Sequence, residues 1–513
     1  LAILIKSYLE RLENVKSVSI EGPGFININL DNSFWHKQIL KILKLKSKFG
    51  ESQVFLNNNI NVEFVSANPT GPLHVGHVRG AVIGDVLSNI LKMVGYKVTK
   101  EYYVNDAGNQ IDILANSVFI RYEEIILKQK AVIPEGYYPG EYLIPVAKSL
   151  YDLHNDSLLN CDRFKALEII KKFSIDFILN EIKIDLGRLN IEMDKYSSEK
   201  KLVQNLSVDK TIQELKNKGL IYSGILPSPK SKVEDWEPKE QTLFKSKIFG
   251  DDEDRTIIKS DGTLTYFASD IAYHRDKLIR TKGKLINIWG ADHGGYVKRM
   301  LAAVNAIADK EGQLEIKLCQ MVNLIKNNQP LKMSKRDGNF VTLKEIIEEV
   351  GGDAIRFIML TRKNDQVLDF DFNKVTESSK DNPVFYVKYA HARICSVLKK
   401  SKELGFLKEK NNIDLSYLND EVHLKLIKSL TYWPKVIEAS AIHKEPHRVA
   451  FYLIELSSNF HSLWSLGREN NKFRFFQKEN DECTYAYLSL IKTLKIVISS
   501  GLNILSVSAP EEM

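Results

Sequence analysis

The sequence predicts an α/β protein of several domains, in which a parallel-sheet domain precedes an all-helical one. Three observations support this fold class. The chain has 513 residues, which exceeds the size at which a single hydrophobic core keeps growing. A strand-like run, a long amphipathic helix and a second strand-like run follow one another between residues 60 and 104. After Pro383, apolar residues recur at helical spacing towards the end of the chain.

The first strand and helix are marked by a change in hydrophobic period. Every second residue from Ile60 to Phe64 is apolar, as expected of a strand. Apolar residues then recur at helical spacing from Val78 to Val94, and Gly95 ends the run. The segment from Tyr96 to Val104 supplies the next strand. We therefore expect a parallel, right-handed βαβ unit.

The most informative motif, His74-Val75-Gly76-His77, lies between this strand and this helix. His77 is then close to a helix N-terminus, where unpaired backbone N–H groups and the helix dipole favour anions. Two imidazoles add directed hydrogen bonds, and Gly76 leaves room for a ligand near the backbone. Alternatively, both histidines only cap the helix or pack against it. The tetrad by itself leaves these two interpretations about even.

A second motif is a basic loop formed by Lys332, Met333, Ser334, Lys335 and Arg336. The apolar run from Leu318 to Ile325 before it is predicted to be a strand. Behind it, Thr342 and Glu345 have the spacing of a capping box, so a helix should begin there and stop at Gly351. A basic cluster alone is more often a solvated face than a binding site.

Together and in this order, the two motifs resemble those of the class I aminoacyl-tRNA synthetases. That resemblance implies a Rossmann-like catalytic domain that uses both motifs to hold ATP, with Mg²⁺ entering bound to ATP. The residues concerned would be His74, Gly76, His77, Lys332, Met333, Ser334 and Lys335. Charge accumulates on phosphoryl oxygens during amino-acid activation, so electrostatic stabilisation should dominate. A lysine about 4 Å from a phosphate oxygen contributes on the order of 4 kcal/mol before desolvation.

Three further stretches resemble the bacterial type of arginyl-tRNA synthetase, and the resemblance extends over nearly the whole chain. These stretches are Val65–Gly80, Tyr102–Gln110 and Asp261–His274. The resemblance implies that the α-amino and carboxylate groups of arginine are held by Ser66, Asn68, His77 and Asn105. It also implies that Tyr266 and Asp270 face the guanidinium group. A carboxylate suits that role because it accepts hydrogen bonds from guanidinium in pairs.

These pocket residues also have simpler interpretations. Ser269 and Asp270 could cap a helix that runs on through Lys277, and without the resemblance the cap is favoured. Tyr266 alone would be a packing aromatic. Glu101 is a second possible carboxylate for the guanidinium group, ranked lower because its strand position also suits an ordinary surface residue.

Candidate adenosine contacts follow another apolar run that ends at Ile288. Gly290, Asp292 and His293 have the composition expected where the carboxyl end of a parallel strand opens onto a nucleotide. Asp292 and His293 could equally be ordinary polar loop residues.

The expected domain organisation has three parts. Residues 1–50 combine a helical pattern with a strand-like run, and they resemble the end of the family's N-terminal tRNA-elbow-binding domain. Residues 55–380 would form the catalytic domain, with an insertion at about 115–255 that shapes the pocket and supports the acceptor end of tRNA. Residues 381–513 would form the helical anticodon-binding domain. We expect no editing site, because a pocket that pairs a buried polar group already rejects analogues lacking it.

The C-terminal helical region mixes apolar positions with lysine, arginine and histidine. Such a pattern is more often a core stripe with a solvated basic side than an RNA surface. The resemblance favours recognition of single-stranded anticodon bases by stacking and edge contacts. Possible contributors are Trp464, Arg468, Phe473 and Arg474. Glu512 stands where the resemblance leads us to expect a basic residue.

Composition, net charge and cysteine spacing limit the classes of protein to which the chain can belong. Hydrophobic residues make up 44% of the chain, mean hydropathy is −0.22, and no apolar stretch reaches the roughly 18 residues of a membrane span. A net charge of +7 permits a nucleic-acid partner without proving one. The four cysteines lack zinc-site spacing, so we expect reduced, buried thiols, no metal site and a cytoplasmic protein. The chain begins with Leu1, so an upstream targeting segment would not be visible.

The combined expectation is a monomeric arginine–tRNA ligase whose partners are tRNA(Arg), L-arginine and ATP, with no membrane partner. Transfer should use the 2′-hydroxyl of the terminal ribose, and arginine activation should require bound tRNA. A different class I synthetase would need another amino-acid pocket. A small HxGH nucleotidyltransferase would be far shorter and would lack the helical C-terminal region. A noncatalytic tRNA-binding paralogue would be expected to lose one of the motifs.

Overall fold

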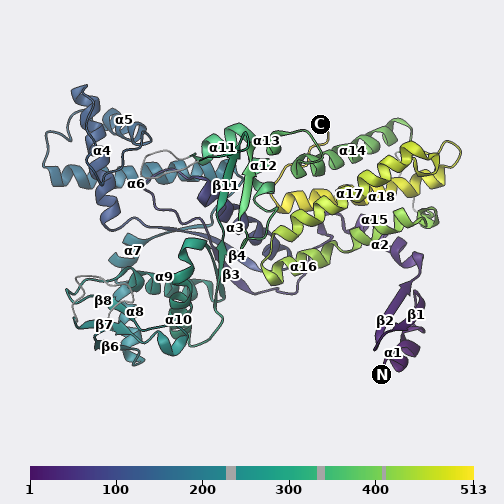
Figure 1. Cartoon of the computed structure of the whole chain (residues 1–513), viewed down its shortest axis with the longest axis horizontal. Coiled ribbons are helices and arrows are strands. Elements are labelled where there is room, and N and C mark those ends of the chain that lie inside the picture. The colour runs from purple at the N-terminus through teal and green to yellow at the C-terminus, as the bar shows by residue number, and fades with distance from the viewer. Residues whose placement is uncertain (227–238, 332–340, 407–411) are drawn as a thin grey trace.

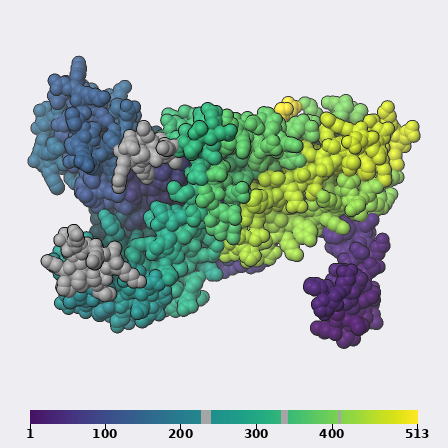
Figure 2. Space-filling view, in the orientation of Figure 1, coloured from purple at the N-terminus to yellow at the C-terminus, as the bar shows by residue number. Residues whose placement is uncertain are grey.

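The computed structural model describes residues 1–226, 239–331, 341–406 and 412–513. A parallel sheet occupies the middle of the molecule (Figure 1), with a helical bundle on one side and two lobes on the other. One lobe contains α4–α6, and the other contains α7–α10 with a small antiparallel sheet. The N-terminal unit of α1, β1 and β2 stands apart from the rest of the chain, as the space-filling view also shows (Figure 2).

The central sheet has five parallel strands in the order β10-β9-β3-β4-β5. Their bounds are β3 Asn59–Glu63, β4 Lys97–Val104, β5 Lys195–Ser198, β9 Lys284–Gly290 and β10 Leu314–Cys319. Glu63 lies opposite Glu101 on one side and Asn287 on the other. Because all five strands run the same way, the segments that follow β3, β4 and β9 start at one edge of the sheet.

The predicted βαβ unit is confirmed. Helix α3, Val75–Met93, joins β3 to the parallel strand β4, and its apolar positions are buried. The helix also packs closely on the sheet: a Cβ added to Gly84 would lie 2.2 Å from Cγ of Phe64. Glycine at that position therefore lets the backbone of α3 approach the end of β3.

Two separate segments enclose β5, so the predicted insertion at about 115–255 is interrupted by a strand of the central sheet. The first segment contains α4 Asn109–Leu127, α5 Leu143–His154 and α6 Arg163–Arg188. The second contains α7 Glu199–Gln204, α8 Ser207–Asn217, β6 Ile221–Gly224, β7 Gln241–Phe244 and β8 Arg255–Ile258. Strands β6, β7 and β8 form an antiparallel sheet, in which β8 contacts α9 Tyr266–Thr281; helix α10 Val297–Ala308 packs on α9.

The predicted strand from Leu318 to Ile325 is wrong as a single element. Strand β10 ends at Cys319, and β11 starts at Val322 in a different sheet, of order β12-β11-β13. The bounds in this region are β11 Val322–Lys326, β12 Gln329–Pro330, β13 Leu368–Asp371, α11 Leu343–Val350, α12 Gly352–Ile358 and α13 Phe372–Thr376. Helix α11 begins at the predicted capping box and ends before Gly351, whose φ is 79°.

The helical region comprises α14 Pro383–Glu403, α15 Glu421–Thr431, α16 Trp433–His443, α17 His447–Glu469 and α18 Asp481–Ile504. The chain before the central sheet comprises α1 Ala2–Leu9, β1 Val15–Glu21, β2 Phe25–Leu30 and α2 Asn32–Leu45. Short 3₁₀ helices span Lys46–Lys48, Lys247–Phe249, Ala291–Tyr296, Leu415–Leu418 and Asn471–Phe473. Helix α2 packs on α15 and α18, so this part of residues 1–50 lies against the helical region.

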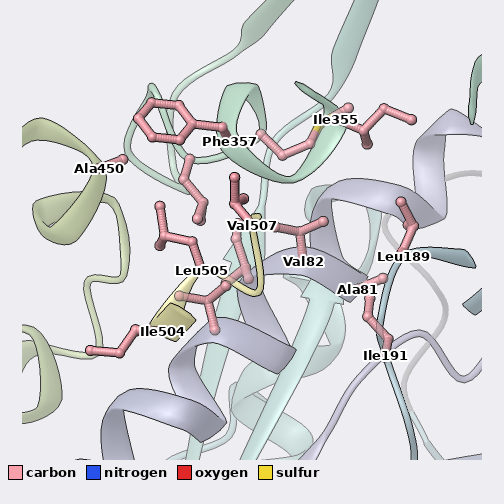
Figure 3. Close-up of a cluster of buried hydrophobic side chains, with 14 of the residues drawn as sticks. Ala81, Val82, Leu189, Ile191, Ile355, Phe357, Ala450, Ile504, Leu505 and Val507 are labelled. Atoms are coloured by element: carbon pink, nitrogen blue, oxygen red, sulfur yellow. The ribbon is translucent and has the colours of Figure 1, made fainter. Parts of the chain in front are cut away.

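A buried junction joins the sheet, the α4–α6 lobe and the helical region. The guanidinium of Arg356 on α12 pairs with Asp85 of α3 and donates to the carbonyl oxygens of Leu189 and Leu505. Asp85 also pairs with Lys100 of β4. Apolar side chains from these parts of the chain also form a buried cluster (Figure 3), which includes Val82, Leu189, Ile355, Ala450, Leu505 and Val507. Parts of the chain far apart in sequence are therefore fixed to one another here.

The four cysteines differ in their exposure to solvent. Cys319, Cys395 and Cys483 are buried free thiols as expected, but Cys161 is exposed. Cys161 precedes α6 in a surface turn, where the sequence carried no signal of exposure. Among the described residues, no helix combines the length and the apolar character needed to cross a membrane.

Candidate active site at the carboxyl edge of the parallel sheet

His74 and His77 together cap the N-terminus of α3. The backbone N–H of Gly76 donates to Nδ1 of His74 at 3.1 Å, and the N–H of His74 lies 3.3 Å from Nδ1 of His77. The two ring centroids are 4.0 Å apart. A Cβ at Gly76 would lie 2.9 Å from the His74 ring, so this packing requires glycine. The capping interpretation therefore describes the local geometry, and it leaves both rings at a helix N-terminus, where anions are favoured.

The start of α3 also contacts the segment that follows the basic loop. Lys332, Met333, Ser334 and Lys335 lie outside the described residues. The next described residues form a bridge to the tetrad: His74 pairs with Thr342, and the N–H of Leu343 donates to the carbonyl of Leu73 at 2.8 Å. Thr342 caps α11 reciprocally with Glu345, as the sequence predicts. The described segment that begins after the basic motif is thereby attached to the start of α3.

Ser66 lies in a tight turn directly after β3. Val65 and Ser66 both have positive φ, 69° and 41°, a conformation that non-glycine residues adopt rarely. The Ser66 hydroxyl donates to Oε1 of Glu63 at 3.1 Å and accepts from the N–H of Tyr103 at 3.1 Å. Hydrogen bonds to β3 and to β4 thus hold the turn in place. A backbone strained in this way is common at functional sites.

Asn68 and Asn105 lie on the two segments that follow β3 and β4. Asn68 is exposed, and its amide donates to Oε1 of Gln110 at 2.7 Å. Asn105, with its amide oriented to satisfy its surroundings, donates to the carbonyl of Ala107 and to Oε2 of Glu199 at 2.9 Å. The fold therefore brings these two predicted pocket residues to the same edge of the sheet.

Asp270 does not cap α9, so that alternative is wrong. The helix begins four residues earlier at Tyr266, with Thr265 at the N-cap, and Asp270 lies in its second turn. Oδ2 of Asp270 accepts a hydrogen bond of 2.6 Å from the Tyr296 hydroxyl. Desolvation raises the pKa of Asp270 to about 7, with a further contribution from the charges of Glu199 and Glu63.

A carboxylate whose pKa is raised by burial and by other carboxylates would be stabilised by a cation. A ligand guanidinium supplies one, along with paired N–H donors. Glu199 itself is buried, and desolvation raises its pKa as well. The region around Asp270 therefore has the electrostatic character expected of a cation-binding pocket.

Tyr266 is 69% exposed, so it is not the packing aromatic that its residue type alone suggests. A Cβ added at Gly108 would lie 3.6 Å from the Tyr266 hydroxyl. The ring of Tyr266 thus extends from the first turn of α9 towards the segment that follows β4 and contains Asn105.

Gly290 is the last residue of β9, and Asp292 and His293 lie in the 3₁₀ helix that follows it. The Asp292 and His293 side chains are exposed and lie 3.6 Å apart. A Cβ at Gly290 would be 2.3 Å from Oδ1 of Asp292, so a larger residue there would displace the Asp292 carboxylate. Since β9 adjoins β3, these residues share the sheet edge with the HVGH turn.

Sequence reasoning misjudged Glu101. Its side chain is fully buried and accepts two hydrogen bonds from the Arg280 guanidinium, one of 2.8 Å to Oε1 and one of 3.2 Å to Oε2. Ser197 and Asn61 also donate to it. Glu101 therefore already binds a guanidinium from its own chain. Arg280 is 179 positions away in sequence, so no local pattern could have indicated this partner.

Among the described residues, no cluster of three or more histidine, cysteine, aspartate or glutamate side chains is arranged to hold a metal ion.

Sequence reasoning did not identify Tyr103 and Tyr296 as residues of this region. The ring of Tyr103 packs in a tilted arrangement on that of Tyr273, with the centroids 4.4 Å apart, and the Tyr296 hydroxyl donates to Asp270. Their aromatic character was visible in the sequence, but their position beside the carboxylates depends on tertiary packing.

Comparison with known proteins identifies the family. A model described as tRNA synthetases class I (R), catalytic domain, matches residues 38–137 and 160–397. A model described as DALR anticodon binding domain matches residues 387–513. The arginine–tRNA ligase of Roseobacter denitrificans is 50% identical over 503 residues, covering 97% of this chain and 86% of that protein. That of Rickettsia bellii is 49% identical over 519 residues, covering 100% and 90%.

Solved structures agree with this assignment. A putative arginyl-tRNA synthetase from Campylobacter jejuni superposes with a TM-score of 0.81 at 33% identity, covering 94% of this chain and 100% of that one. The Thermus thermophilus arginyl-tRNA synthetase has a TM-score of 0.75 at 19% identity, with 100% and 91% coverage, and supports the fold alone. With a class I catalytic model and close relatives along nearly its whole length, this chain belongs to the arginine–tRNA ligase family of class I aminoacyl-tRNA synthetases.

Proposed function

We propose that this protein activates L-arginine with ATP to form arginyl-adenylate and transfers the arginyl group to the 3′-terminal ribose of tRNA(Arg), in protein synthesis. Family membership supports this reaction. The structural observation that supports it best is the half-buried carboxylate of Asp270, which lies beside two other carboxylates near the sheet edge that carries the HVGH turn. An acidic pocket beside an anion-favouring helix terminus suits a substrate with a guanidinium at one end and a carboxylate at the other.

The proposed activation step needs no covalent protein intermediate. A carboxylate oxygen of arginine forms a bond to the α-phosphorus of ATP, the bond to the bridging oxygen breaks, and pyrophosphate leaves. His74 and His77 at the start of α3 would bind the phosphate chain, and Gly76 would allow its close approach. We assign stabilisation of the departing pyrophosphate to Lys332 and Lys335, with Met333 and Ser334 contacting ATP. This assignment rests on the sequence motif.

Arginine would be held at both ends. Asp270 would accept the guanidinium N–H groups, with Tyr266 beside it, while Ser66, Asn68, Asn105 and His77 would bind the α-amino and carboxylate groups. This places the reacting carboxylate near His77 and hence near the α-phosphate. Gly290, Asp292 and His293 would contact the adenosine from the adjoining strand end. The amino-acid pocket and the nucleotide site would thus share one edge of the sheet.

In the transfer step the 2′-hydroxyl of the terminal ribose would attack the arginyl carbonyl carbon. AMP would leave with the bonding electron pair, and its phosphate would take up the hydroxyl proton. We assign the anticodon of tRNA(Arg) to the helical region, with Trp464, Arg468, Phe473 and Arg474 as candidate contacts. The insertion at about 115–255 is proposed to shape the pocket and to support the acceptor end. Mg²⁺ would enter on the ATP phosphates, and we propose that the enzyme acts as a cytoplasmic monomer without a membrane partner.

The assignment of arginine can be tested with an Asp270→Ala variant. We expect arginine binding to be lost while ATP binding is retained, because only the guanidinium partner is removed. Calorimetry with each ligand measures this directly, and Asp292→Ala, which alters the proposed adenosine side, is the matched control. Unchanged affinity for arginine in the Asp270→Ala variant would refute the guanidinium assignment.

A second test addresses the amino acid itself. Aminoacylation of tRNA should occur with arginine and with none of the other standard amino acids. Pyrophosphate exchange should depend on both arginine and tRNA. Rapid exchange without tRNA would contradict the proposed tRNA dependence, and charging with another amino acid would contradict the substrate.

A further inference from the structure

A continuous chain of buried hydrogen bonds runs beneath the proposed arginine pocket. It begins at the backbone carbonyl of Asp270, which lies 2.8 Å from Nδ1 of His274 one helical turn along α9. The carbonyl can only accept, so Nδ1 carries the proton and Nε2 is an acceptor. Nε2 lies 2.8 Å from Nδ2 of Asn287 on β9, which donates to it. The tautomer of His274 is therefore fixed by its two neighbours.

The chain continues from β9 to β3. Nζ of Lys277 donates to Oδ1 of Asn287 at 2.7 Å and to Oε2 of Glu63 at 2.6 Å. The other carboxylate oxygen of Glu63 accepts from the hydroxyl of Ser66. Lys277 is thus the central donor, and from it the bonds lead to the Asp270 backbone in one direction and to Ser66 in the other. We call His274, Asn287, Lys277 and Glu63 the buried relay.

The members of the buried relay are almost completely removed from water. Lys277 and Asn287 have no exposed surface, His274 is 3% exposed, and Glu63 is 6% exposed. Burial and the charge of Lys277 lower the pKa of His274 to about 3, so the imidazole stays neutral at physiological pH. Each hydrogen bond of the buried relay joins one donor to one acceptor. A fully satisfied buried network of this kind is rigid, because each broken bond leaves a desolvated polar group.

The two ends of the buried relay coincide with the two ends of the proposed substrate. Asp270 is assigned to the guanidinium group, and Ser66 is assigned to the α-amino and carboxylate end. The Val65–Ser66 turn has positive φ at both residues, so it needs support from its surroundings to persist. Glu63 supplies that support, and Lys277 holds Glu63 in place.

We infer that the buried relay positions Asp270 and Ser66 at a fixed separation and thereby sets the length of the amino acid that the pocket accepts. This inference rests on the proposed function, in which these two residues bind opposite ends of arginine. His274, Asn287 and Lys277 are positioning residues, because they act on the pocket through Asp270 and Ser66. A site that fixes both ends of a ligand disfavours a homologue that is one methylene longer or shorter.

The test is an Asn287→Leu variant, which breaks the relay between Lys277 and His274 with little change in volume. We expect the KM for arginine to rise about tenfold, while kcat and the KM for ATP change by less than about twofold. The preference for arginine over homoarginine, which is one methylene longer, should fall by a similar factor. Aminoacylation assays at saturating tRNA measure all four quantities.

Asn61→Leu is the matched control. Asn61 is equally buried on the adjacent strand β3, but its amide donates to Glu101, outside the buried relay. It should lose stability as Asn287→Leu does and keep its arginine KM and its preference over homoarginine. Equal changes in arginine KM for both variants would mean that the effect is a general loss of packing, and would overturn the inference.

A second variant keeps the test decisive if Asn287→Leu folds poorly. This second variant is a double one, His274→Phe with Asn287→Leu. Both partners of the hydrogen bond between His274 and Asn287 become apolar, so no acceptor of that bond is left unpaired. This variant should recover thermal stability but retain the weakened arginine binding and the reduced discrimination. Wild-type protein that fails to charge tRNA with arginine would refute the proposed function. Active wild type together with unchanged arginine discrimination in the variants would refute the buried relay alone.

Discussion

The hydroxyl of Tyr296 donates a 2.6 Å hydrogen bond to Oδ2 of Asp270, from a residue 26 positions further along the chain. Asp270 projects from α9, whereas Tyr296 ends the 3₁₀ helix that follows β9. The phenol thus stabilises the ionised form of a carboxylate that burial and neighbouring carboxylates drive towards its neutral form. The balance between these effects keeps the pKa of Asp270 near physiological pH.

Arginine affinity should therefore depend on pH. Asp270 must be ionised to accept the guanidinium group, and with a pKa of about 7 it is protonated as the pH falls. The dissociation constant for arginine should rise about tenfold between pH 8 and pH 6. Calorimetric titrations at each pH measure it. Tyr296→Phe removes the stabilising donor, so its pH profile should shift to higher pH, and an affinity that is constant from pH 6 to pH 8 would contradict the role of Asp270.

The same carboxylate should cost the protein stability at high pH. Its pKa is raised on folding from 3.8 to about 7, so its contribution to stability is present below pH 3.8 and is lost as the pH rises through 7. Asp270→Asn should therefore raise the melting temperature above that of wild type at pH 8, with no such gain at pH 4. Thermal unfolding at the two pH values measures this difference. A lower melting temperature for Asp270→Asn at pH 8 would mean that the ionised carboxylate is not destabilising.

Arg356 should be essential to the buried junction between the sheet, the α4–α6 lobe and the helical region. Its guanidinium is fully buried and joins α3, the end of α6 and the segment after α18. Arg356→Met leaves Asp85 with Lys100 alone and leaves two carbonyl groups without their donor. We expect the free energy of unfolding to fall by about 3–5 kcal/mol, as measured by denaturant titration. Arg448→Met is the control. It breaks the ion pair between Arg448, whose side chain is 44% exposed, and Glu445, and should lower the free energy of unfolding by less than about 1 kcal/mol.

Alanine substitution at Gly84 and at Gly80 on α3 should change the stability of the fold in opposite directions. A Cβ at Gly84 would lie 2.2 Å from Phe64, whereas the nearest atom to a Cβ at Gly80 is 3.9 Å away. Gly84→Ala should destabilise the fold by about 1–3 kcal/mol through overpacking. Gly80→Ala should stabilise it by about 0.5–1 kcal/mol through helix propensity. Chemical denaturation of the two variants measures both signs, and a stable Gly84→Ala protein would contradict the close approach of α3 to β3.

Glu512 should weaken tRNA binding at low salt. Its carboxylate pairs with Lys399 of α14 at 2.8 Å, and both side chains are exposed. Glu512→Gln would leave Lys399 available to a phosphate, so the KM for tRNA should fall by about twofold to fivefold at low ionic strength and change little at high salt. Aminoacylation assays over a salt series measure this. Glu403→Gln, which breaks the exposed Lys400 pair, is the control, and equal effects in both variants would mean that only net charge matters.

The parts of the site that sequence could predict are those set by local interactions. The HVGH turn, α3 and the capping box at Thr342 follow from residues within one or two helical turns of each other, and all are confirmed. The start of α9 was harder to predict, because Ser269 and Asp270 also suit an N-cap. The helix begins four residues earlier, where the Thr265 hydroxyl donates to the carbonyls of Thr256 and Ile257.

By itself, the sequence determined the parallel βαβ unit, the helical C-terminal region, the HVGH and KMSKR motifs and the resemblance to arginyl-tRNA synthetases. Only the tertiary structure decided which carboxylates are already paired. Glu101 is neutralised by Arg280 and Glu63 by Lys277, across 179 and 214 positions of sequence, while Asp270 receives only a neutral phenol in the described part of the chain. Burial makes an unpaired charge costly. A structural carboxylate is therefore distinguished from one that remains available to a cation by its distant partner, which no local pattern encodes.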